Sequence, residues 1–176
     1  VATGSLPYLM PILGVERASV VEVRELLQEK VEVGQNVVVI AGEQYIQALS
    51  AADFLAEKGK TVELLTEGLY PGARLDAATL QVLLPRLLTK GVKLTSSTGV
   101  KEITENAVVV FNVFTSEERR IEGVDTVVIA TEGKADDALY RSLRGRVKEL
   151  YAVGHCVSPR KMITSVLDGA GVGRML

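Results

Sequence analysis

The sequence predicts an α/β fold with a Rossmann-like parallel sheet, built from βαβ units, and a small antiparallel β-meander. A short, unbroken apolar run rich in β-branched residues at 36–41 predicts a strand buried on both faces, as in a parallel sheet, and residues 61–65 (TVELL) predict a second strand. A helical pattern lies between them, so about 30 residues hold a strand, a helix, a glycine and a strand, the order of a right-handed βαβ unit. Short apolar runs between residues 92 and 123, separated by turn residues, predict the meander.

Composition excludes several classes of function. The 176 residues are 47% hydrophobic, more than a disordered chain carries and enough for one domain with a core. A net charge of −2 leaves no basic face for nucleic acid. No apolar run approaches the ~20 residues of a membrane helix, so we expect no membrane partner and a cytoplasmic location. The neighbours His155 and Cys156 are too few ligands for a structural zinc site, so we expect no metal.

The region before the first buried run is predicted to hold a strand end, an extended connector and one helix. Residues 1–4 look like the end of a strand and a turn, and prolines and a glycine within 5–15 predict an extended connector. A helix is predicted over 20–29, with Ser19 as its N-cap and Glu22 as the capping-box partner.

The helix of the βαβ unit is predicted over 45–58, and Gly59 should end it as a C-cap. Its small apolar residues at i, i+3, i+4 and i+7 share one face, which lets the helix lie close against a sheet. These residues are Ala48, Ala51, Ala52 and Leu55.

The next segment is predicted to hold a helix followed by the meander. Asp76 should cap the helix, Pro85 should bend it, and Gly91 should end it. The meander is predicted from four short strands, at 92–94, 100–103, 107–113 and 119–123.

The remaining chain is predicted to hold a buried strand at 125–130, a short helix at 137–143 and a strand at 149–153. The last strand leads into Gly154, His155 and Cys156. A final helix is predicted next, with a serine N-cap at 158 and a proline in its first turn at 159.

The loop after the first strand departs from the dinucleotide-binding pattern G-x-G-x-x-G. The glycines of that pattern give a tight turn and let the backbone approach a pyrophosphate. Residues 41–48 read AGEQYIQA. If Gly42 is the first glycine, the third and sixth positions are Gln44 and Gln47.

The alternative alignment places Ala48 sixth, with Glu43 first and Tyr45 third. Either alignment keeps at most one small residue, and the carboxylate of Glu43 would repel a phosphate. Three interpretations stay open: intact dinucleotide binding, a loop kept only as part of the fold, and weak or altered nucleotide binding where N–H groups at the helix start favour an anion. The candidate cofactor-binding residues of the loop are Gly42, Glu43, Gln44, Tyr45 and Ile46.

The end of the second strand supplies two further candidates, Thr66 and Glu67. An acidic residue at this place accepts hydrogen bonds from ribose hydroxyls in NAD sites. Thr66 occupies the aligned position and Glu67 follows it, so Glu67 either serves as this acceptor or is a solvated loop carboxylate. The nearest arginine is Arg74, and none lies at 66–68 to favour a 2′-phosphate.

Five stretches of the sequence together resemble one family. They are 1–4 (VATG), 37–59 (VVVIAGEQYIQALSAADFLAEKG), 61–66 (TVELLT), 127–133 (VVIATEG) and 151–161 (YAVGHCVSPRK). In this order they resemble the two-dinucleotide-binding flavoproteins of the pyridine-nucleotide-disulfide-reductase type. Within that family the chain is most similar to the carboxy-terminal half of the enzymes related to 2,4-dienoyl-CoA reductase and trimethylamine dehydrogenase.

The resemblance implies a division of the chain into three segments. Residues 1–34 would be a remnant of an FAD-domain segment with a connector. Residues 35–133 would be an NAD(P)-binding-like Rossmann domain, and residues 134–176 the returning FAD-domain segment.

The resemblance also implies three further cofactor-binding candidates. Gly133 lies in the ATG-like turn at which such chains return to the FAD domain, and Gly154 and His155 lie at the family's G-D motif. His155 replaces the aspartate that holds an oxygen of FAD, and imidazole can still hydrogen-bond a ribityl oxygen or a phosphate. A capped turn without a cofactor is the alternative.

The function that the resemblance implies is that of a nucleotide-binding fragment, equivalent to the NAD(P)H domain, of a multidomain flavin-dependent oxidoreductase. NAD(P)H or ADP would bind its degenerate phosphate loop, FAD would belong to the parent protein, and the remaining parent domains would be its partners. The parent would be an NAD(P)H:flavin oxidoreductase, and the isolated fragment would not turn over. The alternatives are a vestigial ADP-binding or structural docking domain without redox turnover, and a free-standing regulatory α/β domain. No residue is assigned a catalytic role.

Overall fold

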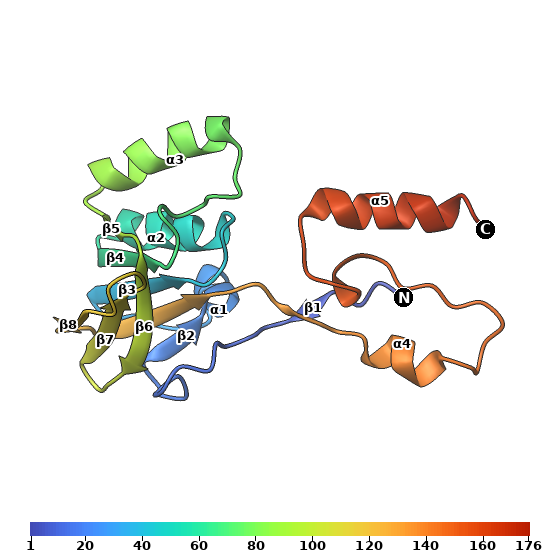
Figure 1. Cartoon of the computed structure of the whole chain (residues 1–176), viewed down its shortest axis with the longest axis horizontal. Helices are drawn as coiled ribbons and strands as arrows, with labels where there is room; N and C mark the ends of the chain where they lie inside the picture. The colour runs from blue at the N-terminus through green and yellow to red at the C-terminus, as the bar shows by residue number, and fades with distance from the viewer. The chain divides into compact units, whose positions relative to one another are not determined.

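The computed structural model describes all residues from 1 to 176, which divide into two compact units. Unit 1 combines residues 1–8 with residues 132–176, and unit 2 is residues 9–131. Unit 2 contains a five-stranded parallel sheet in the order β2-β9-β3-β4-β5 (Figure 1). In that order the strands are Val20–Glu22, Thr126–Ala130, Asn36–Ala41, Thr61–Thr66 and Lys93–Thr95.

The βαβ unit predicted from the sequence is present. Strands β3 and β4 pair in parallel along their whole length, from Asn36 opposite Thr61 to Ala41 opposite Thr66. Helix α2 (Gln47–Glu57) joins them and ends before Gly59, whose positive φ of 74° favours glycine. The predicted small-residue face of α2 is buried, with Ala48, Ala51, Ala52 and Leu55 at most 2% exposed. The prediction of an α/β fold with a parallel sheet is therefore confirmed.

The parallel sheet is covered on both faces. Alternate residues of β3 enter two different cores: Val37 and Val39 pack with α1 (Val23–Leu27), α2 and α3 (Ala77–Thr89), whereas Val38 and Ile40 pack with the meander. The predicted meander is an antiparallel sheet of three strands, β6 (Thr98–Ile103), β7 (Ala107–Asn112) and β8 (Glu118–Glu122). Burial on both faces explains why β3 reads as an unbroken apolar run.

The helix after the βαβ unit begins and ends as its sequence predicts. The carboxylate of Asp76 accepts a hydrogen bond from the Thr79 backbone N–H at 2.9 Å, which caps α3. Pro85 lies inside the helix, and Gly91 follows its end with a φ of 79°.

Two predictions for short elements of unit 2 are wrong. The helix expected over 20–29 is a strand followed by one short helix, because Val20 pairs with Val127 of β9 and holds β2 in the sheet. The cap of α1 is Glu22, whose carboxylate accepts from the Arg24 N–H at 2.8 Å, and not Ser19. The strand expected at 92–94 is β5, and its parallel pairing with β4 places it in the main sheet instead of the meander.

Unit 1 contains little regular structure. Strand β1 (Ser5–Leu6) pairs antiparallel with β10 (Lys134–Ala135), and two helices follow, α4 (Ala138–Leu143) and α5 (Met162–Gly173). A single 3₁₀ turn, η1 (Gly154–Cys156), lies between these helices. Gly154 and Cys156 are the two buried residues of unit 1.

Two strand predictions and one helix start are wrong in unit 1. Residues 1–4 and 149–153 form no strand. The two segments are joined by isolated hydrogen bonds, from the Val1 amino group to Tyr151 O at 2.7 Å and from Val153 N to Val1 O at 3.0 Å, and not by a ladder. Helix α5 begins at Met162, because Ser158 N donates to Gly154 O and so belongs to the turn after η1.

The structure contains neither a membrane-spanning helix nor a group of metal-binding side chains. None of the helices combines the length and the apolar character that crossing a bilayer requires. No group of three or more histidine, cysteine, aspartate or glutamate side chains is arranged to hold a metal ion.

Candidate functional site

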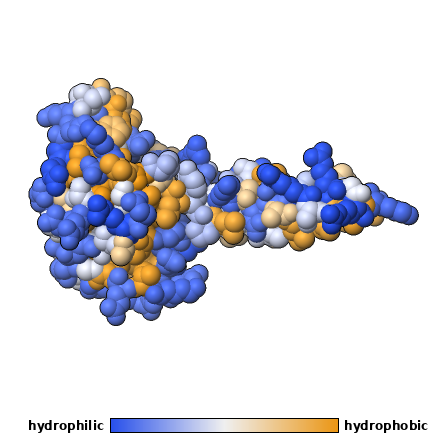
Figure 2. All heavy atoms as spheres, turned by 90° about the horizontal axis from the view of Figure 1, so that it is seen from below, coloured by the Kyte–Doolittle hydropathy of each residue, from blue (hydrophilic) through white to orange (hydrophobic).

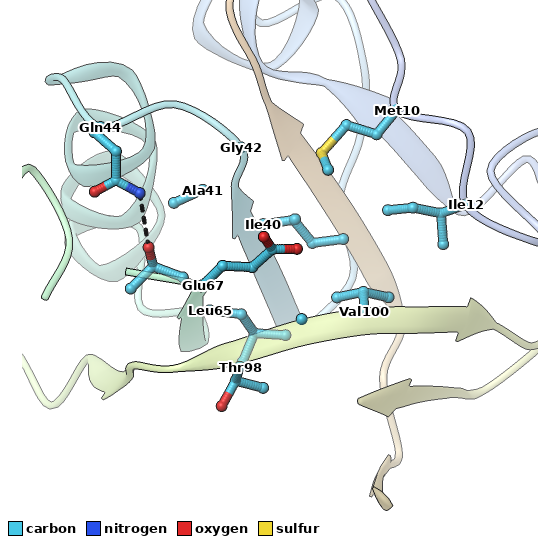
Figure 3. Close-up of a pocket in the computed structure, with 12 residues that line it drawn as sticks. Met10, Ile12, Ile40, Ala41, Gly42, Gln44, Leu65, Glu67, Thr98 and Val100 are labelled. Atoms are coloured by element: carbon cyan, nitrogen blue, oxygen red, sulfur yellow. Dashed lines mark hydrogen bonds between the residues drawn. The ribbon is translucent and has the colours of Figure 1, made fainter. Parts of the chain in front are cut away.

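A cavity of about 100 Å³ opens in unit 2 at the carboxyl ends of β3 and β4 (Figure 3). Ligands of open α/β sheets bind outside this end of the strands. The loop after β3, the end of β4, the start of β6 and the segment before β2 all contribute to the wall. Its polar side chains are Gln44, Thr66, Glu67 and Thr98, and its apolar ones include Met10, Ile12, Ile40, Leu65 and Val100.

The loop after β3 begins at a glycine because its neighbours leave no space for a side chain. A Cβ at Gly42 would lie 2.7 Å from Thr131 Cγ2 and 2.8 Å from Met10 Sδ. The Gly42 N–H donates to the carbonyl of Ala130 at 2.9 Å, which ties the loop to the end of β9. Gly42 thus performs one role of the first Rossmann glycine, a tight turn against the sheet.

Glu43 points back into the fold and caps α2. Its side chain is 3% exposed, and its carboxylate accepts hydrogen bonds from the backbone N–H groups of Tyr45 and, at 3.1 Å, of Ala48. No other side chain caps this helix, and its first turn contains no acidic residue. The carboxylate therefore lies at the positive end of the α2 dipole, where a bound anion would otherwise lie. This bond pattern also explains why α2 begins at Gln47 and not at Tyr45.

Gln44 joins the loop to the end of β4. Its Nε2 donates to Thr66 Oγ1 at 3.1 Å, the bond drawn in Figure 3, and Thr66 Oγ1 also accepts from Gly68 N at 3.1 Å. The other amide atom, Gln44 Oε1, is buried without a hydrogen-bond partner. A buried acceptor without a partner is uncommon in folded proteins, and Figure 3 shows this oxygen on the side of the amide turned away from Thr66.

Thr66 and Glu67, the two candidates for the ribose-binding position at the end of β4, have different surroundings. Thr66 is 1% exposed, and its hydroxyl already serves Gln44 and Gly68. Glu67 is exposed, and Figure 3 shows its carboxylate directed over the cavity, toward Ile40. Glu67 is therefore the carboxylate that a ligand in the cavity would meet.

The remaining predicted residues are not among those that line this cavity. Ile46 is 44% exposed and does not line it. Tyr45 is half-buried and contacts Arg74, whose guanidinium lies 5.7 Å from the ring centroid. Gly133, Gly154 and His155 belong to unit 1.

Sequence reasoning missed the contributions of Met10, Thr98 and Val100 to the cavity. They come from the connector before β2 and from β6. The alternation of apolar residues along β6 indicates a strand with one buried face, but it does not indicate which end of the parallel sheet that strand covers.

The predicted flavin-binding residues of unit 1 are occupied by contacts within that unit. Gly154, with a φ of 74°, donates its N–H to Asp168 Oδ2 at 3.1 Å, and Arg160 Nη2 donates to the same oxygen at 2.6 Å. His155 Nε2 hydrogen-bonds the carbonyl of Arg160 at 2.7 Å. Cys156 is buried and its thiol donates to the Val153 carbonyl at 3.2 Å. In this structure Gly154 N and His155 Nε2 thus take part in a capped turn, and their contact with a flavin stays a prediction.

Comparison with known proteins places this geometry in a family. The chain is 31% identical to the N,N-dimethylglycine/sarcosine dehydrogenase of Chromohalobacter salexigens, over 99% of the chain and 27% of that protein. It is 26% identical to the dimethylamine dehydrogenase of a Hyphomicrobium species, over 85% of the chain and 24% of that protein. The chain therefore spans about a quarter of the length of these curated relatives.

Solved structures show the same fold. A complex of 2-naphthoyl-CoA reductase with 2-naphthoyl-CoA superimposes with a TM-score of 0.86 at 28% identity, covering 98% of this chain and 26% of that one. Histamine dehydrogenase from Rhizobium sp. 4-9 gives a TM-score of 0.87 at 22% identity, over 99% of this chain and 30% of that one, and supports the fold alone. The sequence model of the pyridine nucleotide-disulphide oxidoreductases matches residues 1–169. The chain belongs to the pyridine nucleotide-disulphide oxidoreductase family.

Proposed function

We propose that unit 2 is the nucleotide-binding domain, equivalent to an NAD(P)H domain, of a larger flavin-dependent oxidoreductase. The observation that carries this proposal is the carboxylate of Glu67, which lies over a cavity at the carboxyl end of β4. An acidic residue at this place binds the adenosine ribose in NAD sites. The family supports a pyridine nucleotide as the ligand class.

The residues around the cavity fit the nucleoside part of such a ligand. Glu67 is a charged acceptor for ribose hydroxyls, and Gln44 and Thr98 are further polar residues of the wall. Ile40 and Leu65 supply apolar wall for a base. When bound, a nicotinamide would supply the hydride chemistry, and the residues of this chain would bind and orient the nucleotide.

The residues around the phosphate loop fit a diphosphate less well. The N–H groups of Tyr45 and Ala48 already donate to Glu43. This supports the second candidate function, a vestigial ADP-binding or structural docking domain without redox turnover.

The place of the chain in its parent follows from the same proposal. The predicted bounds, 1–34, 35–133 and 134–176, differ from those of the two units, because residues 9–34 belong to unit 2. Unit 2, residues 9–131, would be the inserted nucleotide domain, and residues 1–8 and 132–176 would be pieces of a split FAD domain. The remaining parent domains would be its partners and would carry FAD, so we expect the 176-residue chain to have no turnover by itself. The short coverage of the relatives supports a parent with further domains.

Calorimetric titration of the full chain with NADH, NADPH and ADP tests the proposal. We expect dissociation constants on the order of micromolar for NADH or NADPH, and ADP binding alone would favour the vestigial domain. Glu67→Gln should weaken binding about tenfold, because the ribose hydroxyls would then donate to a neutral amide oxygen instead of a charged carboxylate. Glu105→Gln, which removes the same charge from an exposed position in the turn between β6 and β7, is the control. No binding of any of the three ligands, or equal affinities for wild type and Glu67→Gln, would contradict the proposal.

A further inference from the structure

Glu43 occupies the place at which a phosphate would contribute affinity. Its carboxylate is buried and accepts from the N–H of Ala48 in the first turn of α2 and from the N–H of Tyr45 in the loop before it. In open α/β sheets the N–H groups of this loop and of the first helical turn bind the ligand phosphates, with help from the helix dipole. Here a negative charge of the chain already lies at this helix end and accepts from two of those N–H groups.

Displacing Glu43 would exchange one anion for another. A diphosphate could accept the same N–H groups only after the carboxylate had left them, and the helix end would have lost one negative partner to gain another. If Glu43 stayed, its charge would repel the phosphates at short range in a partly buried site. In either case the diphosphate gains little net attraction at this loop.

The neighbouring cavity is independent of these N–H groups. Its charged acceptor, Glu67, follows β4, and the side chain of Gln44 crosses from the loop to Thr66 at the end of that strand. Glu43 is not among the residues that line the cavity. Contacts with a nucleoside and contacts with a diphosphate thus depend on different residues.

We propose that Glu43 is a specificity-determining residue that makes this site select the nucleoside part of its ligand. The site binds adenosine about as tightly as ADP, because the diphosphate adds no affinity while Glu43 caps α2. This inference rests on the proposed function, since it assigns a preference to the same nucleotide site.

The test compares adenosine with ADP by calorimetry on the full chain, at one fixed ionic strength. For wild type we expect the two dissociation constants to agree within about threefold, which is less than one charge-assisted contact contributes. Glu43→Gln removes the charge and keeps an oxygen acceptor, and Glu43→Ala frees both N–H groups. We expect ADP to bind about tenfold more tightly to Glu43→Ala than to wild type, with a smaller gain for Glu43→Gln. The dissociation constant of adenosine should stay within about twofold of the wild-type value in both variants.

The control and the contrary outcomes separate this inference from the proposed function. Glu105→Gln should leave both affinities unchanged, because it alters the net charge outside the loop. The role of Glu43 would be overturned if wild type bound ADP ten or more times as tightly as adenosine. It would also be overturned if the ratio of the two dissociation constants were the same in wild type and in both variants. Absence of binding of both ligands to wild type would overturn the proposed function itself. If circular dichroism shows that Glu43→Ala does not fold, Glu43→Gln decides the question.

Discussion

Unit 2 and unit 1 bury their apolar residues very differently. All buried hydrophobic residues except Cys156 lie in unit 2, where the parallel sheet has a core on each face. Helix α5 of unit 1 buries none of its residues. Four of its apolar side chains are 59–79% exposed, namely Met162, Ile163, Val166 and Leu167. Apolar side chains are visible on the surface of unit 1 at the right of Figure 2.

The difference teaches where the stability of the chain originates. Burial of apolar surface is the main favourable contribution to folding, and a segment without a core lacks that contribution. Unit 2 can therefore position the nucleotide cavity on a rigid support. Unit 1 instead shows hydrogen bonds between short segments, such as those of Asp168 with Gly154 and Arg160.

The largest difference in stability between the two units is expected when one leucine of each unit is replaced by alanine. Leu55 of α2 is fully buried, whereas Leu167 of α5 is 63% exposed. Leu55→Ala should lower the free energy of unfolding by about 2–5 kcal/mol, because it removes packed methyl groups and leaves a cavity. Leu167→Ala should change it by less than about 0.5 kcal/mol. Urea denaturation followed by circular dichroism measures both, and equal losses would contradict the contrast between the units.

A smaller loss of stability is expected from substitution of Glu63 of β4, whose carboxylate links the two sheets of unit 2. Its carboxylate accepts from Thr95 at 2.7 Å, from Lys93 at 3.0 Å and, from the meander, from Arg119 at 3.1 Å. Burial opposes ionisation, but these hydrogen bonds outweigh it and hold the pKa of Glu63 below its ordinary value of 4.5.

The pH dependence follows from the sign of that shift. A lowered folded-state pKa stabilises the fold above the unfolded-state pKa, and this stabilisation is lost as the pH falls through the folded value. Glu63→Gln should therefore be less stable than wild type at pH 7, by about 1–3 kcal/mol, and the difference should shrink below pH 4.5. Asp168→Asn, in unit 1, is the matched control and should barely alter the unfolding of unit 2. A difference between wild type and Glu63→Gln that stays constant with pH would show that Glu63 acts by packing alone.

Local patterns were sufficient to predict the parts of the fold that depend on neighbours in sequence. The run at 36–41 and the spacing of Ala48, Ala51 and Ala52 predicted β3 and the buried face of α2 correctly. Each of these signals needs only one segment and its period.

The short strands and the capped loop could not be predicted in the same way. Val20 and Lys93 belong to strands only because β9 and β4 lie beside them, so their pairing is a tertiary property. The charge of Glu43 indicated a conflict with phosphate, but not that its carboxylate turns back onto Tyr45 N and Ala48 N. That geometry depends on the path of the whole loop.

The most direct test of the nucleotide site is a titration of the ¹⁵N-labelled full chain with ADP, followed by amide chemical shifts. Glycine amides report on both regions, because Gly42 and Gly99 line the cavity, Gly68 follows β4, and Gly154 lies in unit 1. We predict saturable shifts at Gly42, Gly68 and Gly99, and little change at Gly154. Shifts centred on Gly154, or no shifts at millimolar ADP, would contradict a nucleotide site at the carboxyl ends of β3 and β4.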